Sequence, residues 1–425
     1  MHRAVVVILD GLRRDFVDPA RTPRLAAFAA QAETFAAFRT AFPSATRAVS
    51  ASFATGCHPA RHTLQGNAVA LLEDGGLVAH DVGRPDFLAH KRAATGCALA
   101  VPTLAEILAP YGGEIIFNNV SPGAANAHDP EAHGQLYHRV ISRGPGGVAA
   151  AGPLRVTLDA AGDHAMTERF IAEALPRRPA LAVLWLGEPD HIQHETPLGS
   201  PEHLAVLREA DRNAGAVIDA VARQRAAGDD MMLMVGSDHG HETVCGAVDV
   251  EAELVAAGLM RTSAPGELVA LSNGTASLIY LHPDQESRRG PLEDFLRSRP
   301  WAGVVVPAAE LGTIGQAPHH ALAFAVSLRA DDGPNAYGVP GRALAAVPRW
   351  DKPVREGCGQ HGGLARYEQS PALLIEGAGF AGGSVTTRPA HIVDLAPTIL
   401  RHLGMAAAEL GMAAAEMDGR ALQTG

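Results

Sequence analysis

Residues 4–11 read AVVVILDG, a run of apolar residues that ends at Asp10 and Gly11. Two later runs have the same form, Leu181–Leu186 before Glu188-Pro189-Asp190 and Met231–Val235 before Ser237-Asp238-His239. Continuous apolar runs of this length are typical of strands that are buried on both faces, as in a parallel sheet. Ligands of such sheets bind beyond the carboxyl ends of the strands. We therefore expect the polar residues that follow the three runs to line a site.

Helical patterns lie between these runs. Thr22-Pro23 and Ser200-Pro201 each combine an N-capping hydroxyl with proline at the first helical position. Asp163–Leu175 and His391–Leu403 are further helical segments. Strands that alternate with helices predict an α/β fold, with a doubly wound, mostly parallel sheet flanked by helices.

Residues 250–356 differ from the rest of the chain. Turn sequences such as Asn273-Gly274 and Asp332-Gly333-Pro334 separate short apolar runs, among them Ala276–Leu281 and Ala321–Leu328. This pattern predicts an inserted α+β lobe that caps the site. Residues 1–249 and 357–425 would then form the catalytic core, with a smaller insertion over about residues 69–100.

The composition narrows the classes of function. The chain has 425 residues, with 35 Lys+Arg against 46 Asp+Glu and a net charge of −11. It has no apolar run of the roughly 20 residues that span a bilayer, so no membrane segment is expected. The acidic balance disfavours a nucleic acid polymer as partner. It still allows a small anionic phospho-substrate, because a bound metal ion reverses the local field.

The four cysteines are widely spaced and form no CxxC motif, which disfavours a disulfide framework. The first apolar run also stops too early, at Asp10, to be the core of a signal peptide. We therefore expect a cytoplasmic protein, and a homo-oligomer is compatible with the sequence.

Three aspartates and three histidines stand in turn-like contexts that contain glycine or proline. They are Asp10 in LDG, Asp190 and His194 in EPDHIQH, Asp238 and His239 in SDHG, and His361 in GQHGG. Together with one hydroxyl they would supply seven donors. That number suits two tetrahedral zinc ions with one position left for substrate or water.

A hydroxyl of this kind occurs in FPSATRAVS, residues 42–50. Thr46 follows a turn that begins with proline and would open a helix, whose N-terminus favours anions. The segment contains several serines and threonines, so the pattern alone does not single out Thr46.

The ordered set of LDG, FPSxT…TG with CHPARH, EPDxxxH, SDHG and GQHGG resembles the alkaline phosphatase superfamily. Within it, the nucleotide pyrophosphatase/phosphodiesterase branch and the related phosphonoacetate hydrolases are most similar. The motifs extend from residue 10 to residue 363. The resemblance implies a metal-dependent hydrolase that cleaves a small phosphodiester or nucleotide pyrophosphate through a phospho-threonine on Thr46.

The resemblance also implies two Zn²⁺ ions, with Mn²⁺ as the other candidate. By motif match, one ion is held by Asp10, Thr46, Asp238 and His239, and the other by Asp190, His194 and His361. His191 and His241 stand beside these motifs, and we expect them to orient ligands.

One position departs from the family pattern. The phosphodiesterases usually carry asparagine three residues after the nucleophile, where this chain has Val49. Arg47 can supply a charge-assisted donor to the phosphate instead, and Asn67 and Asn118 are further candidates for substrate binding.

Alternative functions follow from the same residues. A C–P bond hydrolase of the phosphonoacetate type would use the same metals and nucleophile, with Lys91 as a candidate for the substrate carboxylate. A phosphomonoesterase or sulfatase is a weaker alternative, since Cys57 in CHPAR matches the sulfatase spacing but follows the expected Thr55-Gly56 turn. The complete ligand set disfavours a metal-binding protein without catalytic activity.

Overall fold

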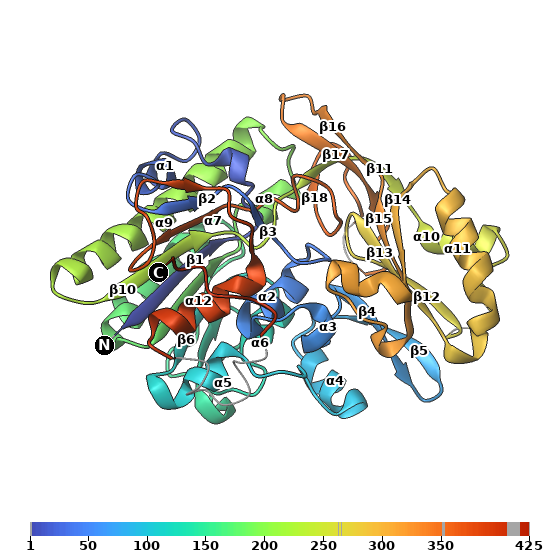
Figure 1. The fold of residues 1–425 in the computed structure, drawn as a ribbon, viewed down its shortest axis with the longest axis horizontal. Coiled ribbons are helices and arrows are strands. Elements are labelled where there is room, and N and C mark those ends of the chain that lie inside the picture. The colour runs from blue at the N-terminus through green and yellow to red at the C-terminus, as the bar shows by residue number, and fades with distance from the viewer. Residues whose placement is uncertain (1, 262, 265, 351–352, 406–416, 425) are drawn as a thin grey trace.

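The computed structural model describes residues 2–424 except 262, 265, 351–352 and 406–416. Its centre is a nine-stranded sheet of order β20-β2-β19-β10-β1-β9-β6-β7-β8 (Figure 1). Five adjacent strands of this sheet pair in parallel. They are β10 (Met231–Gly236), β1 (Arg3–Leu9), β9 (Leu181–Leu186), β6 (Glu114–Asn118) and β7 (Gln135–His138).

The edges of the sheet are mixed. β19 (Leu373–Glu376) is antiparallel to β10 and to β2 (Glu33–Phe35), and β8 (Ser142–Arg143) is antiparallel to β7. β20 (Val385–Thr386) pairs in parallel with β2. The predicted mostly parallel α/β sheet is therefore confirmed, and its three polar-ended strands are neighbours in the order β10-β1-β9.

Helices cover both faces of the sheet, because successive side chains of a strand point to opposite sides. Val5, Val7 and Leu9 of β1 belong to the core beneath three helices, α1 (Pro23–Phe28), α7 (Ala160–Arg169) and α9 (Pro201–Ala226). Val6 and Ile8 belong to the opposite core. That core includes residues of α2 (Thr46–Thr55), α5 (Leu104–Leu108), α6 (Pro122–His128) and α12 (Leu395–His402).

Both helices, α1 and α9, begin at the predicted proline, but the cap predicted for Thr22 is wrong, because the Thr22 hydroxyl makes no capping hydrogen bond and donates to the carbonyl of Phe16 instead. Ser200 accepts a hydrogen bond from the backbone N–H of His203, and Pro201 opens α9 as the sequence predicts. The segment expected at 163–175 is helical but irregular. After α7 it continues as a π-helical turn, Phe170–Ala174, and a 3-10 turn, Leu175–Arg177. Pro176 lies in the 3-10 turn and has no N–H to continue an α-helix.

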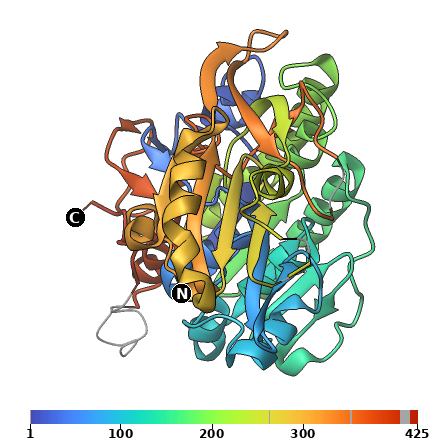
Figure 2. The same cartoon turned by 90° about the vertical axis from the view of Figure 1, so that its right-hand side faces the viewer.

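Two four-stranded sheets lie beside the central sheet, on the right of Figure 1 and toward the viewer in Figure 2. One is antiparallel, with the order β12 (Leu268–Ser272), β13 (Ala276–Leu281), β15 (Leu322–Leu328), β14 (Ala302–Pro307). α10 (Val250–Ala256) and α11 (Arg289–Ser298) share an apolar core with it. The other has the order β16 (Ala330–Pro334), β17 (Pro340–Ala346), β11 (Glu242–Val248), β18 (Gly359–Gln360). This sheet joins β16 and β17, which lie within residues 250–356, to β11 and β18, which lie outside that range. The division into core and cap therefore stays a prediction.

A hairpin of β4 (Ala68–Glu73) and β5 (Gly76–Asp81), followed by α4 (Phe87–Thr95), occupies much of the smaller insertion. Leu71, Leu77 and Phe87 share an apolar core with residues of β12 and β13. The remaining short elements are α3 (Pro59–His62), α8 (Asp190–Gln193) and the β3–β21 pair (Phe38–Arg39 with Ala390–His391). Among the described residues, no helix has the length and hydropathy needed to cross a bilayer.

Candidate metal centre

Three strands bring the predicted ligands together at their carboxyl ends. Ile8 of β1 is level with Gly236 of β10, and Leu9 is level with Leu186 of β9. Asp10 therefore emerges beside Asp238, which follows β10, and beside the loop that leads from β9 into α8. Asp190 is the first residue of α8, and its backbone N–H donates to the carbonyl of Asp10.

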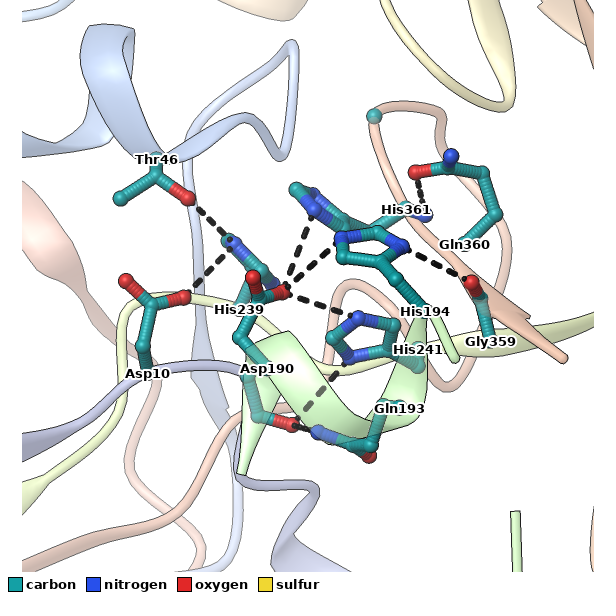
Figure 3. A network of polar contacts seen from close by, with 12 residues as sticks. Asp10, Thr46, Asp190, Gln193, His194, His239, His241, Gly359, Gln360 and His361 are labelled. Atoms are coloured by element: carbon teal, nitrogen blue, oxygen red, sulfur yellow. Dashed lines mark hydrogen bonds and ion pairs between the residues drawn. The ribbon is translucent and has the colours of Figure 1, made fainter. Parts of the chain in front are cut away.

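The first group of donors surrounds His239 (Figure 3). His239 Nε2 lies 3.4 Å from Asp10 Oδ1, 3.2 Å from Asp238 Oδ2 and 3.0 Å from Thr46 Oγ1. Two ligands of a tetrahedral zinc ion at about 2.0–2.1 Å are about 3.4 Å apart. The two carboxylate oxygens are buried and have no hydrogen-bond partner among the described residues. This spacing and these orphaned oxygens fit a divalent cation.

The second group of donors converges on one oxygen of Asp190 (Figure 3). Asp190 Oδ1 lies 3.3 Å from His194 Nε2, 3.0 Å from His241 Nε2 and 3.4 Å from His361 Nε2. These distances again match the edge of a tetrahedral zinc site. The group contains the three residues expected at the second ion together with His241.

Backbone carbonyls set the tautomers of the four histidines. The Nδ1 atoms of His194, His239, His241 and His361 lie 2.6–3.3 Å from the carbonyls of Gly359, Gly240, Gly11 and Ser44, respectively. A carbonyl only accepts, so each Nδ1 carries the proton and donates it. Each Nε2 then keeps its lone pair for a metal ion, an arrangement common among metal-binding histidines.

The pKa shifts of the carboxylates also indicate that positive charge would stabilise the site. Burial raises the pKa of Asp10 and of Asp238, and neighbouring carboxylates raise each further. Burial by itself would raise the pKa of Asp190, but the adjacent His194 and His241 hold it well below its usual value. Burial lowers the pKa of His239 to about 3, so its ring is neutral. Two buried carboxylates and the half-buried Asp190, beside imidazoles, are a donor set that divalent cations complete.

Thr46 is the first residue of α2 and is 9% exposed. It lines a cavity of about 500 Å³ together with Asp10, Asp190, His194 and His361. Its hydroxyl therefore faces both the first donor group and the space where a substrate can lie.

Buried residues hold His361 against this site. Ser44 accepts a hydrogen bond from the N–H of Gly362 at 2.8 Å, and Ser44 Oγ lies 3.1 Å from Glu368 Oε2. Glu368 also accepts from the N–H of Gly363. The GQHGG loop is thereby tied to the turn that precedes Thr46, a link for which the sequence pattern gave no sign.

Arg47 and Asn67 also line the cavity. The Arg47 guanidinium lies 3.1 Å from Asp81 Oδ1, and it donates to Ser121 Oγ at 3.2 Å and to the carbonyl of Asn67 at 3.0 Å. Asn67 Oδ1 accepts from the backbone N–H of Arg47. Arg47 is thus held in one orientation at the cavity wall by three neighbours.

The structure does not bring Lys91 and Asn118 to the cavity. The Lys91 ammonium is buried and donates to Thr63 Oγ1 and to the carbonyl of Cys97. Asn118 is fully buried at the end of β6, where its side-chain oxygen accepts from the N–H of Val120. Burial keeps both side chains away from the position at which we expected them to bind substrate.

The sequence predicts that His241 only orients ligands, but in the structure it belongs to the second donor group. It is fully buried, and its ring centroid lies 4.9 Å from that of His361. A signal for it existed in SDHGH, because residues i and i+2 of extended backbone point to the same side.

Comparison with known proteins identifies the family. The family model described as type I phosphodiesterase / nucleotide pyrophosphatase matches residues 4–295, more than half of the chain. The chain belongs to this family. Its members are metal-dependent phosphodiesterases and phosphohydrolases, so the resemblance inferred from the motifs is confirmed. No curated protein sequence matches the chain.

Solved structures show the alkaline phosphatase-like fold of this family member. Murine ectonucleotide pyrophosphatase / phosphodiesterase 5 is 16% identical, with a TM-score of 0.66 over 95% of this chain and 96% of that chain. Phosphonoacetate hydrolase from Sinorhizobium meliloti 1021, in complex with phosphonoformate, is 16% identical, with a TM-score of 0.68 over 95% and 96%. A mutant of the alkaline phosphatase PafA is 11% identical, with a TM-score of 0.73 over 99% and 98%.

Proposed function

We propose that this protein hydrolyses a small phosphodiester or nucleotide pyrophosphate, with Thr46 as the nucleophile. The observation that carries the proposal is the position of the Thr46 hydroxyl. It lies 3.0 Å from His239 Nε2 within the first donor group, at the start of α2 and on the wall of the cavity.

Two divalent ions, Zn²⁺ in this proposal with Mn²⁺ as the other candidate, would neutralise the phosphate oxygens and the ionised Thr46 oxygen when bound. One would be held by Asp10, Thr46, Asp238 and His239, and the other by Asp190, His194 and His361. The chemistry of the donors supports this assignment, since all are carboxylate oxygens, a hydroxyl oxygen or imidazole nitrogens with a free lone pair.

The proposed reaction has two displacements at phosphorus. Thr46 first gives its proton to solvent, and its Oγ forms a bond to phosphorus while the bond to the leaving oxygen breaks on the opposite side. The leaving oxygen takes a proton from solvent. Water then attacks the same phosphorus, the bond to Thr46 Oγ breaks, and one proton of that water returns to Thr46. The sum is hydrolysis of one P–O bond.

The chain itself orients the phosphate during both displacements. Arg47 follows the nucleophile, and its guanidinium is already held by Asp81 and Ser121. A guanidinium with fixed orientation donates to a phosphate oxygen with little loss of side-chain entropy. We assign to Arg47 the role that asparagine has in related phosphodiesterases, since Val49 is fully buried and has no donor.

The size and lining of the cavity favour an ester over bare phosphate. A volume of about 500 Å³ lies in the range of pockets that enclose a small organic ligand. Pro348, Val354 and the 47% exposed Trp350 contribute to its wall. These apolar groups suit an organic substituent on the phosphate, including an aromatic one.

The alternative function is C–P bond hydrolysis of the phosphonoacetate type. That alternative used Lys91 for the substrate carboxylate, and the burial of the Lys91 ammonium against Thr63 counts against it. Without Lys91, the substrate carboxylate would have to pair with Arg139 or Arg355, which line the cavity.

The test is a substrate panel with metal-loaded protein. The panel contains a bis-aryl phosphodiester, an aryl phosphomonoester, an aryl sulfate and phosphonoacetate, with Thr46→Ala as the matched variant. We expect cleavage of the diester and a loss of kcat on the order of 10³-fold or more in Thr46→Ala. Turnover of phosphonoacetate alone would overturn the diester assignment. Wild-type turnover by a folded Thr46→Ala protein would overturn the role of Thr46.

A further inference from the structure

Two imidazoles and a carboxylate, side chains of the types that bind metal ions, meet outside the cavity on the hairpin and helix of the smaller insertion. Glu73 ends β4, His80 lies in β5 and His90 lies in α4. None of the three lines the catalytic cavity. Glu73 and His80 are partly buried, with side chains 14% and 18% exposed, whereas His90 is 47% exposed. The mechanism proposed above uses none of them.

Both imidazoles point at the same carboxylate oxygen. Glu73 Oε1 lies 2.8 Å from His90 Nε2 and 3.2 Å from His80 Nε2, and the two ring centroids are 4.7 Å apart. The potential ligand atoms of all three residues lie within 4.8 Å of one another. The 3.2 Å distance is close to the roughly 3.4 Å edge of a tetrahedral zinc site, and the 2.8 Å distance is that of a hydrogen bond.

His80 Nε2 has a polar neighbour but makes no hydrogen bond within the described part of the chain. It is buried, and it has no hydrogen-bond partner among the described residues despite its proximity to Glu73. Leaving a buried polar atom unpaired is destabilising. A cation between His80, His90 and Glu73 would satisfy this nitrogen and the carboxylate together.

We propose that Glu73, His80 and His90 form a further zinc site, separate from the catalytic centre. Two imidazoles and one carboxylate are a common protein ligand set for zinc, with a water molecule completing the tetrahedron. Imidazole donors favour Zn²⁺ over Mg²⁺, which prefers a shell of oxygen atoms.

The site would fasten the hairpin to α4 and stabilise the environment of Arg47. His80 directly precedes Asp81, whose carboxylate lies 3.1 Å from the Arg47 guanidinium and also accepts from the N–H of Gly83. A zinc ion bound at His80 would restrict the end of β5 and with it this ion pair. The proposed role is therefore structural, with an effect that reaches the cavity wall.

The test counts zinc in the full-length protein. Wild type, His90→Ala and Glu73→Gln are dialysed against the same buffer with micromolar zinc, and bound metal is measured by mass spectrometry. We expect each variant to hold about one zinc per chain less than wild type, because a three-residue site loses most of its affinity with one ligand. The comparison does not depend on how many ions the catalytic centre holds.

The matched control is His164→Ala. His164 Nε2 lies 3.6 Å from Glu168 in an exposed pair that contains a single imidazole, so this variant is expected to keep the wild-type zinc content. Equal zinc content in wild type and His90→Ala would overturn the proposal.

Hydrogen exchange supplies a second measurement that does not depend on activity. Zinc should slow exchange in residues 68–81 and 87–95 of wild type and of His164→Ala, but not of His90→Ala. If zinc protects these segments equally in His90→Ala, the three side chains are only a hydrogen-bonded cluster and the proposal fails.

Discussion

Replacing His241 with alanine tests whether this residue supports the metal bound at Asp190. His241 is fully buried, and its Nε2 lies 3.0 Å from the same oxygen of Asp190 that His194 and His361 approach. Its Nδ1 lies 3.3 Å from the carbonyl of Gly11. The ring thus links the loop after β1 to the carboxylate of the second donor group.

The expected magnitude follows from this contact. Removing a partner of a metal-bound ligand typically costs about 10–100-fold in metal affinity. We therefore expect His241→Ala to weaken zinc binding at the Asp190 site by about 10–100-fold.

The assay is a zinc titration in competition with a chromophoric chelator, with diester hydrolysis measured in parallel. The matched control is His203→Ala. His203 is another fully buried imidazole, but its Nδ1 accepts from the N–H of Gly199 and its ring packs on Phe16. Both variants remove a fully buried imidazole, but only His241→Ala removes a contact with Asp190. Equal zinc affinity in the two variants would refute the reasoning.

Three other substitutions have defined outcomes. Gly11→Ala places a Cβ 2.5 Å from His241 Cε1 at a φ of +72°, whereas Gly258→Ala has a similar φ of +69° and open space. Urea unfolding should show about 1–2 kcal/mol lost in Gly258→Ala and a larger loss in Gly11→Ala, because its clash with His241 adds to the cost of the positive φ. Zinc affinity should be reduced only in Gly11→Ala. Burial lowers the pKa of His128 from 6.5 to about 3, so stability is complete above pH 6.5 and falls as the pH drops toward 3. His128 contributes about 2 kcal/mol to the loss at pH 5, so His128→Leu should reduce the difference in unfolding free energy between pH 7.5 and pH 5 by about that amount without removing the share of the other buried histidines. Arg47→Ala should lower kcat/KM for the diester by about 10–150-fold, and an effect on stability alone would contradict a phosphate-binding role.

The central sheet was predictable because its strands are buried on both faces. Leu181–Leu186 was predicted with the bounds it has in β9. Continuous apolar sequence is needed where helices cover both sides of a strand. The antiparallel insertion of β19 between β10 and β2 could not be predicted, because it depends on a pairing between segments far apart in the chain.

The order of the motifs in the sequence predicted which residues are ligands. The distances between these residues could be obtained only from the structure. Asp10, Asp238 and His239 follow adjacent strands, so their proximity is a consequence of the sheet order. His361 and Thr46 reach the same place through the buried Ser44–Glu368 link. Neither residue carries a local pattern that indicates this link.

The residues expected to bind substrate do not all lie at the cavity. Arg47 and Asn67 line the cavity, whereas Lys91 is buried elsewhere. Polar residues on loops and insertions have no periodic pattern that would fix their direction. The expected cytoplasmic location, the homo-oligomer and the boundaries of the cap at 250–356 stay predictions from the sequence.

The sequence by itself determined the fold class, the family and the chemical identity of the donors. Apolar runs specify buried strands through the hydrophobic effect, which acts on local composition. Tertiary structure alone decided which atoms meet, because contacts such as that of His241 with Asp190 join residues of separate elements. It also brought together carboxylates that the sequence places far apart. Three of the carboxylates converge at a buried site whose donor groups suit divalent cations.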